Sequence, residues 1–359
     1  MKPQYELCIE IGAIPISVHT DSAEFASLLR DRYGKFVAGC RATGAPNLEW
    51  PRRGELQSRQ DEVEGRSGPP DAAQRVSTLD FPAPSFELEV ELLPPGLMSD
   101  AEEARVRLEG GLWVMERGDF RAECDPVRRR GRVRQSANPY SIDAVLRMLH
   151  SLILARQGGF LVHAASAVRN GRAFLFAGVS GAGKTTISRL APPDVVLLTD
   201  EISYVRKGRE AESGAGIQES GVSSASAEVS KEKAEGAGPN ENQHEAAPNQ
   251  IDSLTPDARP PAPAFAAYGT PFAGELARIG ENLQAPIAAL YLLGQGPGNT
   301  IADVSQADAV RALLQNVLFF AHDDELVQRV FQTALEFVSC VPVRRLTFAP
   351  DARVWELIR

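Results

Sequence analysis

One stretch of eight residues constrains the fold of this chain more than any other. Gly178-Val-Ser-Gly-Ala-Gly-Lys-Thr185 fits the pattern G-x-x-x-x-G-K-[ST] at every fixed position. An apolar run, Phe174–Ala177, precedes it, and residues Thr185–Leu190 suit a helix. A strand, a glycine-rich loop and a helix in this order are typical of a phosphate-binding loop, also called a Walker A motif. The predicted nucleotide-binding residues are Gly178, Val179, Ser180, Gly181, Ala182, Gly183, Lys184, Thr185 and Thr186.

The residue types of this loop indicate its chemistry. Glycines let consecutive backbone N–H groups turn inward around a phosphate, and the positive end of the following helix adds to the attraction. Lys184 brings a mobile charge to the β- and γ-phosphates, and the hydroxyl of Thr185 can ligate Mg²⁺. We therefore expect ATP and Mg²⁺ as cofactors. The alternative is a plain glycine-rich turn with an exposed lysine, which the flanking strand and helix disfavour.

A phosphate-binding loop also needs a carboxylate for the metal, usually at the end of a neighbouring buried strand. Val195-Val-Leu-Leu-Thr-Asp200-Glu201 has this pattern, with an apolar run followed by two adjacent acids. Adjacent residues of a strand point to opposite sides, so one acid can face the metal and the other the acceptor. The alternative is an ordinary charged strand end.

Composition limits the remaining classes. The 47 acidic and 38 basic residues give a formal net charge of -9, which argues against a general nucleic-acid binder. No apolar run reaches the ~18 residues of a membrane span, and the first residues lack the apolar core of a secretory signal, so we expect no membrane partner and a cytoplasmic protein. The cysteines, expected to be buried thiols rather than zinc or disulfide sites, are Cys8, Cys40, Cys124 and Cys340.

Residues 1–135 have the pattern of a small β-rich domain. A polar segment near 43–84, rich in Pro and Gly, predicts a loop, and Ser22 is expected to cap a short helix to Leu29. An arginine-rich run allows a polyanion-binding patch, but it has no interleaved aromatic residues, so we expect a solvated linker between domains. The run comprises Arg128, Arg129, Arg130, Arg132 and Arg134, and the expected strands are Tyr5–Ile11, Phe86–Leu92, Ala104–Leu108, Leu112–Glu116 and Phe120–Cys124.

Residues 136–359 are expected to form a second domain. A helix over Ser141–Gln157 precedes the apolar runs Phe160–Val168 and Ala173–Ala177, and the Asn-Gly pair between these runs predicts a hairpin. The segment near 206–263 has almost no large apolar side chains and predicts a disordered insertion. Later elements are a strand over Ile287–Leu293, helices over Ala307–Phe320 and Glu325–Val338, and a strand over Val343–Phe348, with the acids of His322-Asp323-Asp324 expected to cap a helix rather than bind a metal.

His163 lies in an apolar run, where a lone histidine is more often a satisfied core residue. However, the stretch from Gly159 to Val205 resembles the catalytic core of the HPr kinase/phosphorylase family, whose phosphate-loop fold is shared with phosphoenolpyruvate carboxykinase. Members carry a His in the strand before the hairpin, a G-x-S-G-x-G-K-[ST] loop and a paired acid after a buried strand. His163, Gly178–Thr185 and Asp200-Glu201 match these in order and at similar spacing.

The resemblance implies an α/β fold, with an HPr-kinase/carboxykinase-like P-loop domain of mixed sheet and helices after the β-rich N-terminal domain. It also implies catalytic roles. Asp200 would take the proton of the acceptor hydroxyl, His163 would help to set the protonation state of Asp200, and Lys184 would act on the phosphates. Glu201 and Thr185 would hold Mg²⁺, although Asp200 and Glu201 can exchange the roles of base and metal ligand.

Two departures from the family pattern affect the substrate. The second acid is Glu201 rather than the usual Asp, and the R-G-L-G type signature that follows the core in HPr kinases is missing. The segment Tyr268–Glu275 stands in its place and is similar to a segment of divergent HPr-kinase-like proteins often associated with peptide-modification clusters. Glu275 is either a further metal or substrate ligand or part of a structural loop.

The function expected from this resemblance is an ATP-dependent kinase that phosphorylates a Ser or Thr hydroxyl of an unidentified protein or peptide. A kinase for a small-molecule alcohol and a non-catalytic nucleotide-binding regulator are the alternatives, and a carboxykinase ranks last. No nucleic-acid partner is expected. Relatives of this fold commonly assemble, which leaves a homo-oligomer open.

Overall fold

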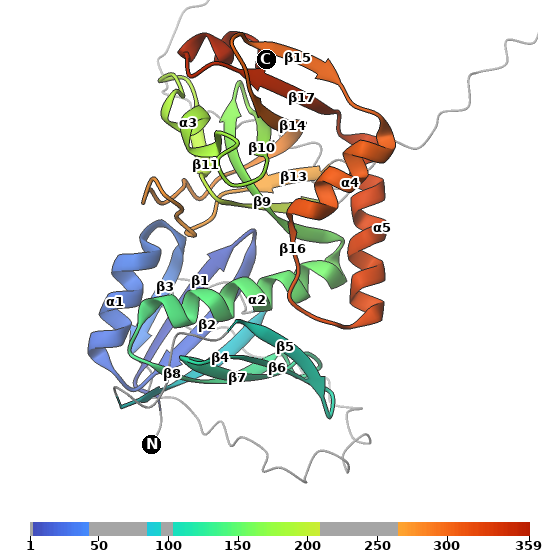
Figure 1. The fold of residues 1–359 in the computed structure, drawn as a ribbon. Coiled ribbons are helices and arrows are strands. Elements are labelled where there is room, and N and C mark those ends of the chain that lie inside the picture. Colours follow the sequence, from blue (N-terminus) through green and yellow to red (C-terminus); the bar gives the residue numbers. More distant parts are fainter. Residues whose placement is uncertain (1–2, 43–84, 95–102, 209–264) are drawn as a thin grey trace, which may run out of the picture. The chain divides into compact units, whose positions relative to one another are not determined.

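The computed structural model describes residues 3–42, 85–94, 103–208 and 265–359 (Figure 1). The fold is mixed α/β and rich in strands, with an eight-stranded mixed sheet and a small five-stranded barrel. Residues 1–207 and 264–359 cluster as one compact unit, so the division expected at residue 135 stays a prediction. The polar loop near 43–84 lies outside the described residues, and so does nearly all of the insertion expected near 206–263.

The eight-stranded sheet contains every strand expected before residue 136. Its order is β3-β1-β2-β4-β8-β7-β6-β5, in which β4 is parallel to both β2 and β8, and the other neighbours are antiparallel. Three of its strands, β2, β3 and β8, were not expected, and all seven residues of β2 are buried. The strands are β1 Tyr5–Ile11, β2 Ile14–Thr20, β3 Val37–Ala42, β4 Phe86–Leu93, β5 Arg105–Glu109, β6 Leu112–Arg117, β7 Phe120–Asp125 and β8 Arg130–Ser136.

The arginine-rich run is not a linker, and that expectation is wrong. Arg130, Arg132 and Arg134 lie on the strand β8, and Gly131, Val133 and Gln135 between them are buried. The neighbouring strand β4 supplies their counter-charges: Arg130 pairs with Glu87 at 3.2 Å, and Arg132 and Arg134 pair with Glu91 at 3.4 Å. Cross-strand pairing of opposite charges explains why so many arginines are tolerated on one strand.

Helix α1, Ala23–Tyr33, contacts both the strands β1 and β2 of the sheet and helix α2, Pro139–Gln157. Ser22 caps α1 as expected, since its side chain accepts a hydrogen bond from the backbone N–H of Phe25. At the other end of α1, the Tyr33 hydroxyl donates to Asp143 of α2 at 2.5 Å, and Arg32 forms an ion pair with the same carboxylate. Helix α2 starts two residues earlier than expected because a proline suits the first helical turn.

The barrel closes because β14 pairs with both β13 and β10. Its strands follow the order β10-β9-β12-β13-β14, and β14 pairs in parallel with β10. The hairpin expected between β9 and β10 is confirmed, with both Asn170 and Gly171 at positive φ. The bounds are β9 Gly159–Arg169, β10 Arg172–Ala177, β12 Ile202–Lys207, β13 Phe265–Tyr268 and β14 Gln284–Gln295.

Four further strands extend the barrel. The strands β11, Val196–Thr199, and β16, Val317–Leu318, both pair with β9. The strand β17, Val343–Phe348, is parallel to β14, and β15, Thr300–Asp303, is antiparallel to β17.

The two ends of the expected insertion lie on paired strands. Lys207 at the end of β12 is opposite Phe265 at the start of β13. The strand pattern therefore continues to Lys207, past the expected start of the insertion at residue 206. The strands β12 and β13, which flank this segment in the sequence, are therefore paired in register up to its two ends.

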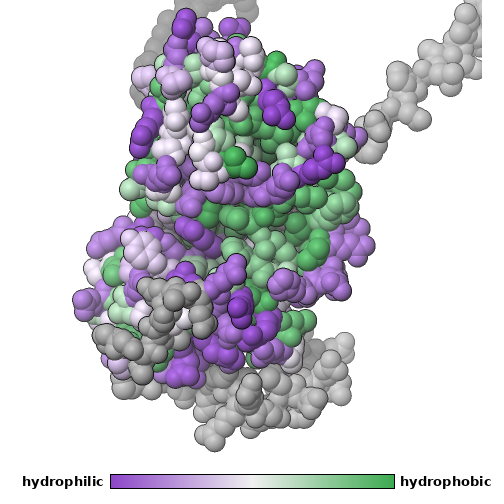
Figure 2. Space-filling view, viewed as in Figure 1, coloured by the Kyte–Doolittle hydropathy of each residue, from purple (hydrophilic) through white to green (hydrophobic). Residues whose placement is uncertain are grey.

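The helix expected over Ala307–Phe320 ends earlier in the structure. Helix α4, Gln306–Asn316, stops short of Phe320 because the next two residues form β16. Helix α5, Asp324–Cys340, is capped by Asp323, whose side chain accepts from the N–H of Leu326, so the capping interpretation is confirmed. Figure 2 shows hydrophobic residues gathered on the visible face over α4 and α5. No helix in the described ranges is long and apolar enough to cross a membrane.

Candidate functional site

The predicted phosphate-binding loop lies between β10 and the six-residue helix α3, Lys184–Arg189. Gly181 and Gly183 adopt positive φ values of 79° and 109°. A Cβ atom on Gly183 would lie 2.7 Å from the ring of Phe348, and one on Gly178 would lie 2.7 Å from the Cβ of Ala182. The backbone angle therefore favours glycine at position 181, the lack of space favours it at 178, and both do so at 183.

Lys184 is curled back onto the loop. Its Nζ donates to the carbonyl of Gly178 at 2.8 Å, and its exposed fraction is only 9%. Burial lowers the pKa of this lysine, and the carboxylates of Glu201 and Glu275 oppose that effect. The lysine is thus held by the backbone carbonyls of Gly178 and, at 3.4 Å, Val179, and the charged oxygens of a phosphate would be stronger acceptors.

The two predicted acids form a turn between β11 and β12 and have different partners. Both carboxylate oxygens of Asp200 accept backbone N–H groups, from Gly274 and from Leu276, each at 2.9 Å. Glu201 is more open, with its side chain one third exposed, and the guanidinium of Arg147 lies 3.8 Å from its carboxylate. Burial raises the pKa of Glu201, and Arg147 opposes this. Asp200 therefore organises a loop, while Glu201 keeps its oxygens accessible.

Glu275 lies against the predicted phosphate-binding loop. The Thr185 hydroxyl donates a hydrogen bond to the Glu275 carboxylate at 3.0 Å. Gly274 fits closely over the acid turn, since an added Cβ would lie 2.9 Å from the Cβ of Glu201. The contact places Glu275 beside Thr185, and both interpretations from sequence, a ligand and a part of a structural loop, stay predictions.

The loop that carries Glu275 is anchored on both sides. The N–H of Thr270 donates to the carbonyl of Leu198 at 3.1 Å, and the Thr270 hydroxyl donates to the carbonyl of Ile202 at 3.0 Å. Further along, Glu281 forms an ion pair with Lys35. These contacts fix the loop against β11, β12 and the turn after α1.

His163 lies on β9 opposite Ile202, the residue that follows the acid turn. It is half-buried, and its pKa is lowered, first by burial and then by the charge of Lys184. The imidazole is therefore neutral near pH 7. His163 thus lies next to the acid turn, and its catalytic role stays a prediction.

Sequence reasoning missed Arg147. Its guanidinium stacks over the ring of Phe272 at 4.9 Å from the ring centroid and faces Glu201. The available signal was its position on α2, where the flanking residues Leu146 and Met148 are both buried. A charged residue between buried positions needs a specific partner, and this partner lies 54 residues further along the chain.

The oxygen donors at this site suit Mg²⁺. Thr185, Glu275 and Glu201 carry hard oxygen ligands, the type that this ion prefers. Within the described ranges, no three His, Cys, Asp or Glu side chains come close enough together to form a metal cage. Protein-bound Mg²⁺ commonly uses one or two carboxylates together with water and substrate phosphates, so these residues fit the ion.

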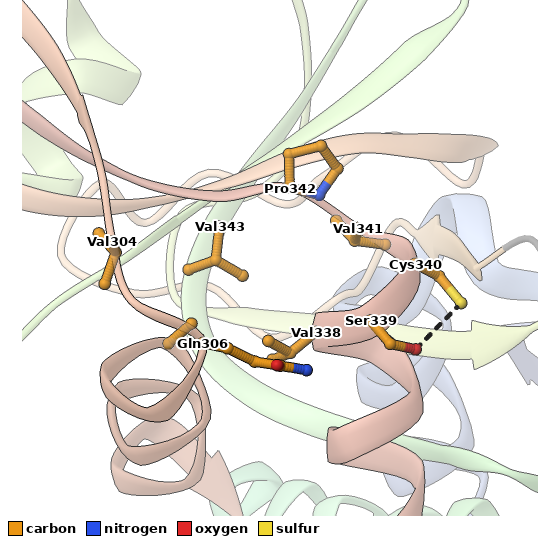
Figure 3. Close-up of a pocket in the computed structure, with 9 residues that line it drawn as sticks. Val304, Gln306, Val338, Ser339, Cys340, Val341, Pro342 and Val343 are labelled. Atoms are coloured by element: carbon orange, nitrogen blue, oxygen red, sulfur yellow. Dashed lines mark hydrogen bonds between the residues drawn. The ribbon is translucent and has the colours of Figure 1, made fainter.

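A pocket of about 440 Å³ lies elsewhere, between α4, the end of α5 and the start of β17 (Figure 3). Its walls are mainly apolar and include Val304, Val338 and Val343, together with Gln306 and Cys340. None of the predicted site residues lines it. The pocket is therefore separate from the predicted phosphate-binding loop.

Comparison of the chain with models of protein families gave no match, and comparison with curated proteins gave none either. The resemblance to HPr kinases thus depends on the residue pattern of Gly159–Val205.

Proposed function

We propose that this protein is an ATP-dependent kinase with an HPr-kinase-like P-loop domain, and that it transfers the γ-phosphate to a Ser or Thr hydroxyl of a protein or peptide. The hydrogen bond from Thr185 to Glu275 carries the proposal. It places the hydroxyl that ends a Walker A pattern beside a carboxylate whose loop is held by the predicted base, Asp200. Three separate segments thereby contribute to one site: the loop provides Lys184 and Thr185, and the other two provide the acids.

The chemistry needs one base and fixed positive charge. The acceptor oxygen would attack the γ-phosphorus, the bond from that phosphorus to the β–γ bridging oxygen would break, and ADP would leave. The proton of the acceptor hydroxyl would pass to the Asp200 carboxylate. A carboxylate has about four acceptor positions, and Asp200 uses two for backbone N–H groups, so it retains the capacity to take this proton.

The neighbouring residues have supporting roles in this proposal. Lys184 would exchange its backbone carbonyls for phosphate oxygens, and the backbone N–H groups of Gly178–Gly183 would surround the phosphate. Neutral His163 would add no competing positive charge next to Asp200. Mg²⁺, held by Thr185, Glu275 and Glu201, would neutralise phosphate charge.

The decisive experiment is phosphate transfer from γ-labelled ATP in the presence of Mg²⁺. Purified protein would be incubated alone and with proteins or peptides encoded beside it in its genome. The wild type would be compared with Asp200→Asn and with Asp194→Asn, a matched control, because Asp194 is an exposed acid in the same segment that pairs with Arg169. We expect label on a Ser or Thr of one partner with the wild type and the control, and none with Asp200→Asn.

Other results would redirect the proposal. Label on a small alcohol instead of a polypeptide would indicate the small-molecule kinase. Tight nucleotide binding without transfer to any acceptor would indicate the nucleotide-binding regulator.

A further inference from the structure

Arg147 has more hydrogen-bond donors than partners. Its Nε is buried and has no hydrogen-bond partner among the described residues. Its ion pair with Glu201 is 3.8 Å long, beyond the range of a hydrogen bond. Buried polar groups without a partner are rare in folded proteins, and each one calls for an explanation, such as a ligand that completes its hydrogen bonds.

The position of this guanidinium is fixed by packing. Its plane lies over the ring of Phe272, which is 1% exposed, so the cation is held against a rigid surface. A guanidinium stays charged at any ordinary pH and offers five N–H donors in a planar fork that matches phosphate oxygens. Arg147 is therefore a pre-oriented cation with unused donors.

Glu201 connects Arg147 to the phosphate-binding loop. Its carboxylate lies 3.8 Å from Arg147, and its Cβ lies close to Gly274, whose neighbour Glu275 accepts a hydrogen bond from Thr185. In a phosphate-binding loop the lysine reaches the β- and γ-phosphates. Arg147 thus lies one carboxylate away from the segment that contacts Thr185, the residue next to the lysine.

We propose that Arg147 binds the terminal phosphate of the nucleotide, exchanging its distant contact with Glu201 for hydrogen bonds to phosphate oxygens. This inference rests on the proposed kinase function and adds a residue that distinguishes a triphosphate from a diphosphate. Glu201, released from the arginine, would become available for Mg²⁺.

The test is equilibrium binding of a non-hydrolysable ATP analogue and of ADP, each with Mg²⁺, measured by calorimetry. For Arg147→Gln we expect the Kd of the ATP analogue to rise by about tenfold or more, with less than about a twofold change for ADP, because charge-assisted hydrogen bonds to phosphate are lost. Arg147→Lys keeps the charge but not the planar fork, so its loss should be smaller and again specific to the triphosphate. If Arg147→Gln does not fold, the comparison of the two nucleotides is made with Arg147→Lys.

Arg156→Gln is the matched control. Arg156 is also on α2 and also stacks on an aromatic ring, that of Trp113, at 4.7 Å from the ring centroid. Both Kd values should stay at wild-type levels in this variant. Equal losses for both nucleotides in Arg147→Gln, or no loss for either, would overturn the role of Arg147 alone. A wild-type protein that binds neither nucleotide would overturn the proposed function as well.

Discussion

The hydroxyl of Thr185 and the carboxylate of Glu275 lie 3.0 Å apart, although 90 residues separate them in the chain. This contact joins the end of the predicted phosphate-binding loop to a segment anchored on the acid turn. A substitution of Thr185 or of Glu275 should therefore affect both nucleotide binding and the position of the acids.

Replacement of Glu275 with Gln tests whether this carboxylate serves the metal. The amide oxygen can still accept from Thr185, but the negative charge is lost. We expect the Mg²⁺ concentration for half-maximal phosphate transfer to rise roughly tenfold, with little change in thermal stability. Glu281→Gln, on the same loop but paired with Lys35, is the control and should keep wild-type Mg²⁺ dependence. An unchanged Mg²⁺ requirement in Glu275→Gln would leave Glu275 with a structural role only.

Replacement of Gly183 with Ala tests the geometry of the loop. The residue has φ of 109°, and a new Cβ would meet the ring of Phe348 at 2.7 Å. We expect a loss of about 1–2 kcal/mol in the free energy of unfolding, or a shifted loop, and at least a tenfold loss of ATP affinity. Gly298→Ala is the control, because an added Cβ there meets no atom within 4 Å. Wild-type ATP affinity in Gly183→Ala would argue against phosphate binding at this loop.

Replacement of Asp200 with Asn should cost stability as well as activity. The amide presents one N–H₂ group to backbone N–H groups that now donate to carboxylate oxygens. We expect a loss of about 1–3 kcal/mol in the free energy of unfolding by urea, since one partly buried N–H loses its acceptor, together with loss of transfer. Exposed Asp194→Asn provides the comparison in both measurements. An Asp200→Asn variant as stable as wild type would show that the turn at Gly274–Leu276 is held by other contacts.

His150 should make the protein sensitive to acid. Burial lowers its pKa from 6.5 to about 3, so the unfolded chain takes up a proton at a pH where the folded chain does not. Its contribution to stability is therefore present above about pH 6.5 and is lost as the pH falls towards 3. Between pH 7 and pH 5 the His150 side chain becomes protonated in the unfolded chain but not in the folded one. This difference lowers the free energy of unfolding by about 2 kcal/mol.

The measurement is urea unfolding of wild type and His150→Gln at pH 7 and pH 5. Glutamine does not titrate, and its carbonyl can accept the hydrogen bond from Tyr204, whose hydroxyl lies 3.0 Å from the His150 ring. The variant should lose about 2 kcal/mol less than wild type between the two pH values. Exposed His322→Gln should behave as wild type. Equal acid sensitivity in all three proteins would show that His150 does not control it.

Local patterns in the sequence were sufficient for several parts of the structure. The hairpin at Asn170-Gly171 follows from the need for positive φ at both turn residues, and the cap at Ser22 follows from the unpaired N–H groups of a helix start. The pattern of Gly178–Thr185 predicted a loop between a strand and a helix, which is where it lies. Each of these depends on residues close together in the chain, so the sequence alone determined them.

Only the tertiary structure decided which distant residues meet. The contacts of Thr185 with Glu275 and of Arg147 with Glu201, and the ion pairs of the β8 arginines with β4, each depend on the order of strands in a sheet or on how a helix packs. Strand order is set by burial summed over many long-range contacts, and no spacing within a short segment encodes it. For this reason the sequence by itself indicated a phosphate-binding loop and its acids, whereas the fold selected the partners that give Asp200, Glu201 and Glu275 different environments.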